Sequence, residues 1–162
     1  MKIYAAYGSN MNIQQMKIRC PKANLLGTGT LEGYRLTFRG SGRGVANIEK
    51  LKGRTVPVVL WKITGRCENS LDIYEGYPRL YVKKDVEVVD SKGEKVKAFV
   101  YVMAEEYADK PALPSLQYLD TILQGYLDNG IDIYCLQAAA SENLKEIDKR
   151  LHEMLNNNSG EN

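Results

Sequence analysis

Two short segments of this 162-residue chain hold residue types that could bind and transform a small anion. The first is Tyr7-Gly8-Ser9-Asn10, which follows a run of alternating apolar residues and precedes a predicted helix. The glycine permits a sharp turn and a close approach of a ligand, and successive amides at such a turn form a concave anion site. The positive end of the following helix would add to it. The segment therefore predicts a carboxylate site, with an ordinary strand-to-helix turn as the alternative.

The second segment carries a glutamate, Glu75, at the predicted end of a short helix. Gly76 follows it and ends the helix, so the carboxylate meets the negative end of the helix dipole. Tyr74, Tyr77 and Tyr81 are close in the sequence and can shield it from water. Both effects raise the pKa of a carboxyl group toward the range that suits proton transfer. Glu75 is therefore a candidate acid/base, and the alternative is a surface glutamate at a helix end.

The composition argues against several other kinds of chemistry. The single histidine, His152, lies near a polar C-terminus and is expected on the surface, so Ser-His-Asp, Cys-His and His-rich metal sites lack their central residue. Cys20, Cys67 and Cys135 are far apart and form no Cys-x-x-Cys pair. We therefore expect buried, reduced thiols rather than a disulfide framework or a zinc site, and neither a metal nor a cofactor.

Charge and hydropathy narrow the range of partners and compartments. The formal net charge of +2 is too small to indicate a nucleic-acid or anionic membrane partner. No apolar run approaches the roughly 20 residues that span a bilayer, and the N-terminus becomes polar too soon for a signal peptide. We expect a cytoplasmic protein that acts on a small molecule, with no nucleic-acid or membrane partner. Its oligomeric state is left open.

The sequence predicts mainly strands in the first part of the chain and helices in the last part, and these elements must position both segments. Strand patterns cover residues 2–7, two pieces of 24–39 around Gly33, 45–49, 56–63 after a turn at Gly53, and a hairpin of 80–89 with 96–103. Helix patterns cover residues 13–19, capped by Asn12, then 68–74, 116–126 and 131–155. This order predicts an α+β fold with a small, curled or closed sheet. We expect one domain over residues 1–155 and a polar, disordered tail over 156–162.

The chain resembles the γ-glutamyl cyclotransferase-like family, which includes the AIG2-like proteins. The resemblance covers about residues 1–140 and rests on motifs that occur in the family's order. These are Tyr7-Gly8-Ser9-Asn10-Met11, Arg19-Cys20-Pro21, residues 31–38, residues 58–63, Leu71-Asp72-x-x-Glu75-Gly76-Tyr77-Pro78-x-x-Tyr81 and Pro114-Ser115-x-x-Tyr118. It implies a small mixed β-barrel with flanking helices, in agreement with the strand and helix patterns.

The resemblance also implies an activity, the release of 5-oxoproline and a free amine or amino acid from a γ-glutamyl compound. In that reaction the substrate's own α-amine attacks its γ-carbonyl, so no nucleophilic side chain and no metal is required. Glu75 matches the family's catalytic glutamate, the Tyr7–Asn10 loop its substrate-binding loop, and Tyr81 and Tyr118 its pocket-lining tyrosines. The leaving group stays open, as does the choice between substrate carboxylate and oxyanion for the loop amides. The alternative is a non-catalytic small-ligand-binding or interaction module on the same fold.

Overall fold

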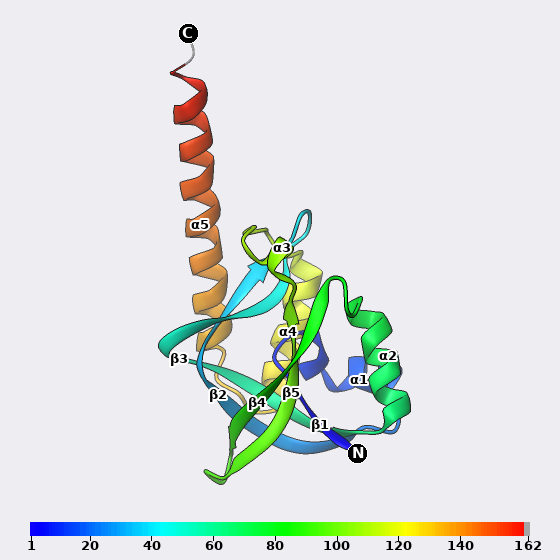
Figure 1. Ribbon diagram of the computed structural model, residues 1–162. Helices are drawn as coiled ribbons and strands as arrows, with labels where there is room; N and C mark the ends of the chain where they lie inside the picture. Colours follow the sequence, from blue (N-terminus) through cyan, green and yellow to red (C-terminus); the bar gives the residue numbers. More distant parts are fainter. Residues whose placement is uncertain (161–162) are drawn as a thin grey trace.

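The computed structural model describes residues 1–160, in which five strands close into a barrel flanked by helices (Figure 1). The strands are β1 (Lys2–Ala6), β2 (Asn24–Arg39), β3 (Val45–Ile63), β4 (Tyr81–Asp90) and β5 (Lys95–Met103). Their order around the barrel is β1-β3-β2-β4-β5. Neighbouring strands are antiparallel except β1 and β5, which close the barrel as a parallel pair. The predicted small mixed β-barrel with flanking helices is confirmed.

The long β2–β3 ribbon differs from the sequence prediction. The expected turn at Gly53 is wrong, because β3 runs without a break alongside β2, and the two expected pieces of β2 are one strand. Gly33 of β2 lies opposite residues 51–54 of β3, where the pairing slips. Gly33 and Gly53 have φ angles of 78° and 84°, a region that glycine adopts readily. The two glycines therefore mark a bulge that bends the ribbon, which helps five strands to close.

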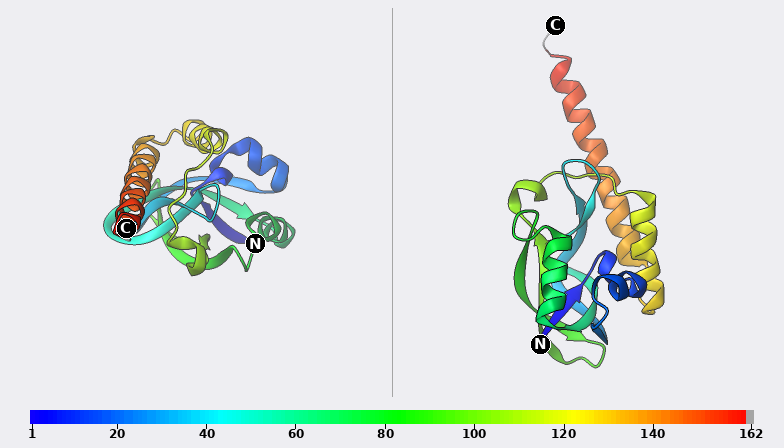
Figure 2. Two further views of the ribbon diagram at one scale, coloured as in Figure 1. Left: turned by 90° about the horizontal axis from the view of Figure 1, so that it is seen from above. Right: turned by 90° about the vertical axis from the view of Figure 1, so that its right-hand side faces the viewer.

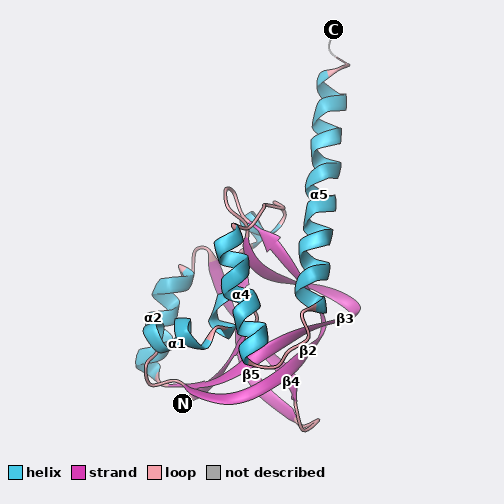
Figure 3. Cartoon of the chain, turned by 180° about the vertical axis from the view of Figure 1, so that it is seen from behind, coloured by secondary structure: helices cyan, strands magenta, loops and turns pink. Residues whose placement is uncertain are grey.

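The helices lie outside the barrel (Figures 2 and 3). They are α1 (Ile13–Arg19), α2 (Gly65–Glu75), α3 (Glu105–Ala108), α4 (Leu116–Asp128) and α5 (Tyr134–Asn158), with a 3₁₀ turn, η1, over Ser9–Met11. The Asn12 side chain accepts a hydrogen bond from the Gln15 amide at 3.0 Å, so the predicted cap of α1 is confirmed. Among these helices, none has the length and apolarity that crossing a bilayer requires.

Helix α5 extends away from the barrel toward the C-terminus (Figure 1). It begins three residues later than expected, at Tyr134, and continues to Asn158. Leu136, Ala139 and Asn143 are buried, whereas every side chain after Ile147 is exposed up to residue 160. Residues 161–162 of the expected tail lie outside the described residues, and the division at residue 155 stays a prediction.

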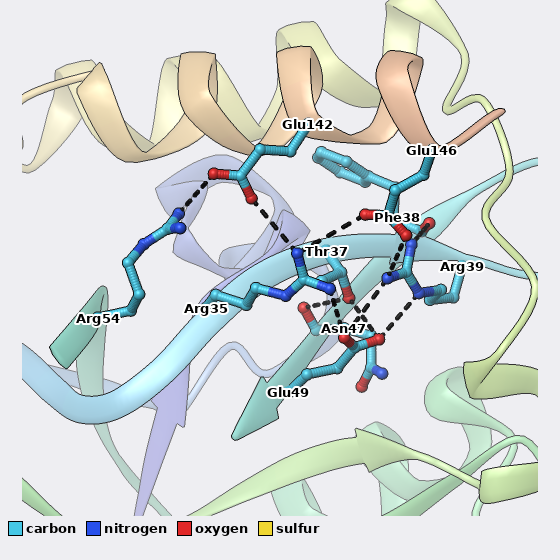
Figure 4. Close-up of polar contacts among 9 residues, drawn as sticks. All are labelled: Arg35, Thr37, Phe38, Arg39, Asn47, Glu49, Arg54, Glu142 and Glu146. Atoms are coloured by element: carbon cyan, nitrogen blue, oxygen red, sulfur yellow. Dashed lines mark hydrogen bonds and ion pairs between the residues drawn. The ribbon is translucent and has the colours of Figure 1, made fainter. Parts of the chain in front are cut away.

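A cluster of ion pairs attaches the buried half of α5 to the barrel (Figure 4). Arg39 of β2 donates from Nε to Glu49 of β3 at 2.8 Å, and its Nη2 lies 2.9 Å from Glu146 of α5. Arg35 lies 3.1 Å from Glu49 and 3.6 Å from Glu142. Because both carboxylates of α5 meet arginines of the barrel, the helix is held at one rotation and height.

Helix α4 packs against η1 at a glycine, and a substitution there tests how tight this contact is. A Cβ atom at Gly125 would lie 2.8 Å from the Asn12 nitrogen and from two atoms of Met11. Alanine is the better helix former by about 1 kcal/mol, but overpacking of this kind destabilises by about 1–3 kcal/mol. We expect Gly125→Ala to lower the free energy of urea-induced unfolding by on the order of 1 kcal/mol net and to displace η1.

The same substitution at an open position serves as the control for Gly125→Ala. A Cβ atom at Gly65, at the start of α2, would meet no atom within 4 Å. We expect Gly65→Ala to leave the unfolding free energy unchanged or to raise it slightly. A Gly125→Ala protein as stable as Gly65→Ala would show that η1 and α4 separate easily.

Candidate active site

A cavity of about 180 Å³ opens where β1, η1, the end of α2 and the start of α4 meet. All of the predicted site residues line it: Tyr7, Gly8, Ser9, Asn10, Glu75, Tyr81 and Tyr118. The cavity is also lined by Tyr74, which was expected to shield Glu75, and by residues that the sequence did not indicate: Tyr4, Val45, Ala46, Leu80 and Tyr101. The structure therefore brings together the two segments that the sequence singled out, although about 65 residues separate them.

Glu75 is the last residue of α2, as predicted. Gly76 follows in the left-handed conformation, with φ of 65° and ψ of 33°, and its amide bonds back to the helix. Burial in the cavity raises the pKa of the Glu75 carboxyl to about 7, and the nearby Arg19 guanidinium opposes that rise. A group with a pKa near neutrality can both accept and return a proton at physiological pH.

The tyrosines next to Glu75 in the sequence do not all shield it. Tyr81 lines the cavity and is buried. Tyr77 does not line the cavity; it is 41% exposed, and its ring centre lies 4.5 Å from the Lys83 ammonium nitrogen. Tyr74 also lines the cavity, although the residue is 45% exposed. The prediction of shielding is thus wrong for Tyr77.

The Tyr7–Asn10 loop meets Glu75 directly. The buried Asn10 side chain donates from Nδ2 to Glu75 Oε1 at 3.3 Å and to the Tyr4 hydroxyl at 3.1 Å. Its main-chain oxygen accepts a hydrogen bond from the Trp61 indole at 3.0 Å, which fixes the loop to β3. Within the described residues, the amides of Gly8, Ser9 and Asn10 donate to no other group. The three residues line the cavity, so these amides are candidates for an anion site there.

The remaining walls are phenols that are held in place by main-chain groups. The hydroxyls of Tyr7 and Tyr81 donate to the carbonyls of Tyr101 and Ala46, and the Tyr118 hydroxyl accepts from the Ala46 amide at 2.9 Å. Burial raises the pKa of all three predicted wall tyrosines, so they are uncharged at neutral pH. A Cβ atom at Gly8 would lie 3.1 Å from the Ala46 Cβ, which leaves little room for another residue there.

Sequence reasoning missed Arg19 as part of this site. The residue ends α1, and its guanidinium bonds to the side chains of Ser9 and Asn10. It also missed Tyr4 and Tyr101, which come from the neighbouring strands β1 and β5. A signal was available for Arg19 alone, since it lies in one of the motifs that the family shares, although its side chain could also have faced solvent.

The residue types excluded earlier lie away from the cavity. His152 is on the exposed part of α5, as expected. Cys20 and Cys67 are buried and unpaired thiols, as predicted, while Cys135 is only partly buried. Among residues 1–160, no three His, Cys, Asp or Glu side chains converge in a metal-binding arrangement.

Comparison with known proteins places this geometry in a family. The profile of the family described as "Gamma-glutamyl cyclotransferase, AIG2-like" matches residues 4–120. The chain belongs to this family. It is 32% identical over 140 residues to the Homo sapiens γ-glutamylcyclotransferase, covering 81% of this chain and 73% of that protein. The Bos taurus γ-glutamylcyclotransferase is 31% identical with the same coverage.

A solved structure agrees with the sequence comparison. A structure named γ-glutamyl cyclotransferase superposes with a TM-score of 0.74 at 30% identity, over 82% of each chain. The α+β barrel and the prediction of an enzyme of the γ-glutamyl cyclotransferase type are therefore confirmed at the level of the family. The family's profile spans both segments that line the cavity, from the Tyr7–Asn10 loop to Tyr118.

Proposed function

We propose that this chain releases 5-oxoproline and a free amine or amino acid from a γ-glutamyl substrate, with Glu75 as the general acid/base. The observation that carries the proposal is the 3.3 Å contact between Glu75 and Asn10, in a cavity whose loop amides are unused. A carboxylate and an anion site this close can act on the two ends of one small substrate. The family membership supports the γ-glutamyl part of the substrate.

The proposed reaction needs proton transfers at both nitrogens and one bond exchange. The Glu75 carboxylate takes one proton from the substrate's α-ammonium, and the free amine attacks the γ-carbonyl carbon. As the ring nitrogen–carbon bond forms, Glu75 gives that proton to the leaving nitrogen and takes the second proton from the ring nitrogen; the bond to the leaving nitrogen breaks, and the second proton leaves with the released amine or passes to water. A pKa of about 7 suits both steps. Folding the substrate into its reactive shape contributes at most about 7–11 kcal/mol of the barrier reduction.

The loop amides and the phenols supply the positioning. The free amides of Gly8, Ser9 and Asn10 would hold the substrate's α-carboxylate, or the oxyanion that develops on the γ-carbonyl. The uncharged hydroxyls of Tyr81 and Tyr118 also line the cavity and are fixed by Ala46. Their bonds to the main chain keep the cavity open, which favours the enzyme over a binding module whose pocket is filled.

The test is the release of 5-oxoproline from a panel of γ-glutamyl amino acids and γ-glutamyl amines. Because the substrate's α-amine is the nucleophile, we expect each active substrate to lose all reactivity when that amine is acetylated. An unchanged rate with the acetylated substrate would indicate ordinary hydrolysis by water. We also expect kcat/KM to rise as the pH increases through about 7, where Glu75 becomes ionised.

A further inference from the structure

Arg19 differs from Lys83, another cation beside α2, because no carboxylate of the described residues lies within ion-pair distance of it. It forms no ion pair with any residue in the described part of the chain, whereas Lys83 of β4 lies between Glu68 and Asp72 of α2 at 2.7 and 2.8 Å. Its guanidinium carbon lies 3.5 Å from the centre of the Tyr74 ring. A surface ion pair therefore does not explain why the guanidinium is held in this place.

The guanidinium is held by the loop that carries the anion site. Nη1 of Arg19 donates to the Ser9 hydroxyl at 3.3 Å and to Oδ1 of Asn10. The Tyr74 hydroxyl lies 3.2 Å from the same Ser9 oxygen, so ring, hydroxyl and guanidinium form one rigid rim. Stacking on an aromatic face and a planar fork of donors are the features in which arginine differs from lysine.

These contacts decide which end of the Asn10 amide faces Glu75. A guanidinium only donates hydrogen bonds, so it selects the oxygen end of the Asn10 side chain. The nitrogen end is thereby turned to Glu75 Oε1 and the Tyr4 hydroxyl. The opposite orientation would place the amide oxygen against the carboxylate, where both groups are acceptors. Arg19 therefore acts on Glu75 through Asn10.

The other groups around Glu75 give it no opposite charge. The phenols that share its cavity come from five elements or the segments beside them: Tyr4, Tyr7, Tyr74, Tyr81, Tyr101 and Tyr118. Burial raises the pKa of Tyr4, Tyr7, Tyr81, Tyr101 and Tyr118, so these are neutral at pH 7. Asp72, one turn before Glu75, is neutralised by Lys83. Arg19 is thus the charge that opposes the effect of burial on Glu75.

We propose that Arg19 is a positioning residue of this site: it orients the Asn10 amide toward Glu75 and, by its charge, keeps part of Glu75 in the carboxylate form at neutral pH. The proposal rests on the proposed role of Glu75 as acid/base. Without Arg19, burial would keep most of the carboxyl protonated at neutral pH, and the protonated form cannot accept the substrate's proton.

The first test compares Arg19→Gln with the wild type over a range of pH. Loss of a neighbouring positive charge raises the pKa of an acid, so we expect the acid limb of kcat/KM to move upward by on the order of one pH unit. At pH 7 a rise of one unit in the pKa lowers the ionised fraction of Glu75 by about fivefold. Raising the pH to about 9 ionises the carboxyl again and restores the activity that was lost for this reason. A loss of activity of equal size at every pH would overturn the electrostatic part of the proposal.

Two further variants separate charge from geometry. Arg19→Lys keeps the charge but lacks the planar fork of donors. We therefore expect the acid limb of its kcat/KM profile to lie near that of the wild type. We expect a lower kcat, because the Asn10 side chain is no longer held in one orientation. A limb displaced as far as in Arg19→Gln would contradict the proposal. Arg66→Gln removes a charge from an exposed position on α2 and is expected to behave as the wild type.

The second test does not depend on activity. The ¹³C carboxyl resonance of Glu75, assigned by its loss in Glu75→Gln, is titrated in the wild type and in Arg19→Gln. We expect the midpoint to rise by the same amount as the kinetic limb, and an unchanged midpoint overturns the proposal. If the wild type releases no 5-oxoproline, or Glu75→Gln stays active, the proposed function fails, yet the titration still decides whether Arg19 sets the charge of Glu75.

Discussion

Replacing Glu75 with glutamine is expected to lower kcat by about 10²–10⁴-fold while making the folded protein more stable above neutral pH. The loss of activity follows because an amide cannot take the proton from the substrate's ammonium group. The size is that of a missing general acid/base, and the residual rate comes from substrate positioning by the Tyr7–Asn10 loop. The measurement is 5-oxoproline release under saturating substrate.

The gain in stability follows from the sign of the pKa shift. The pKa of Glu75 is about 7 in the folded chain, against an ordinary value of 4.5, so the unfolded chain loses its proton first as the pH rises. The wild type therefore becomes less stable between about pH 4.5 and 7, by on the order of 3 kcal/mol in total. Glutamine has no charge to bury, so Glu75→Gln should escape this decline.

Urea unfolding at several pH values checks this second effect. We expect the two proteins to be equally stable near pH 4 and to diverge as the pH rises, with the variant the more stable. Glu153→Gln, on the exposed end of α5, should show neither the loss of activity nor the divergence. Equal stabilities of Glu75→Gln and the wild type at all pH values would mean that the carboxyl is well solvated.

Features that depend on neighbouring residues were readable from the sequence. The cap of α1 by Asn12 and the end of α2 at Glu75 before Gly76 follow from local hydrogen bonding and from glycine's freedom in the left-handed region. The strands of the β4–β5 hairpin follow from period-two alternation. In each case the groups that satisfy the backbone lie within a few residues, so tertiary context had little to change.

Gly53 shows where local reading fails. A glycine with positive φ fits a turn and a bulge equally well, and only the partner strand decides between them. In β3 the residues on both sides of Gly53 find partners in β2, so the chain bends without leaving the sheet. Pairing between strands is a long-range property, and no pattern within β3 reports it.

The sequence predicted which residues line the site better than it predicted what shifts the pKa of Glu75. Helix-dipole and tyrosine arguments gave the correct direction for the pKa of Glu75. The structure attributes the rise to burial first, and part of that burial comes from Tyr4 and Tyr101 on two strands that meet only when the barrel closes. Arg19 lies 56 positions before Glu75, so its opposing charge becomes visible only once α1 and α2 are packed together.

The ion-pair cluster between α5 and the barrel leads to the second prediction with a large effect, which concerns the free energy of unfolding. We expect Arg39→Leu to lower the free energy of unfolding by about 3 kcal/mol, because breaking a buried pair leaves the carboxylates of Glu49 and Glu146 without this partner. The Arg39 side chain is only 4% exposed, and it contacts both carboxylates within 3 Å. The figure lies at the low end for buried pairs, since the two glutamates are 27% and 33% exposed and Arg35 remains beside them.

A matched arginine in the same cluster tests whether burial sets the size of the effect. Arg54 reaches Glu142 of α5 at 2.9 Å, but its side chain is 38% exposed. We expect Arg54→Leu to change the unfolding free energy by less than about 1 kcal/mol, as is usual for exposed pairs. Equal losses for Arg39→Leu and Arg54→Leu would contradict the argument from burial.

A double-mutant cycle then distinguishes the effect of an unpaired charge from the effect of lost packing around Arg39. If the loss in Arg39→Leu comes from the unpaired carboxylate of Glu146, removing that carboxylate as well in Arg39→Leu/Glu146→Leu should recover part of it. We expect the double variant to be more stable than the sum of the two single changes by on the order of 1–2 kcal/mol. Strict additivity would mean that α5 is held by its apolar contacts at Leu136 and Ala139, and that Arg39 contributes only through its own packing.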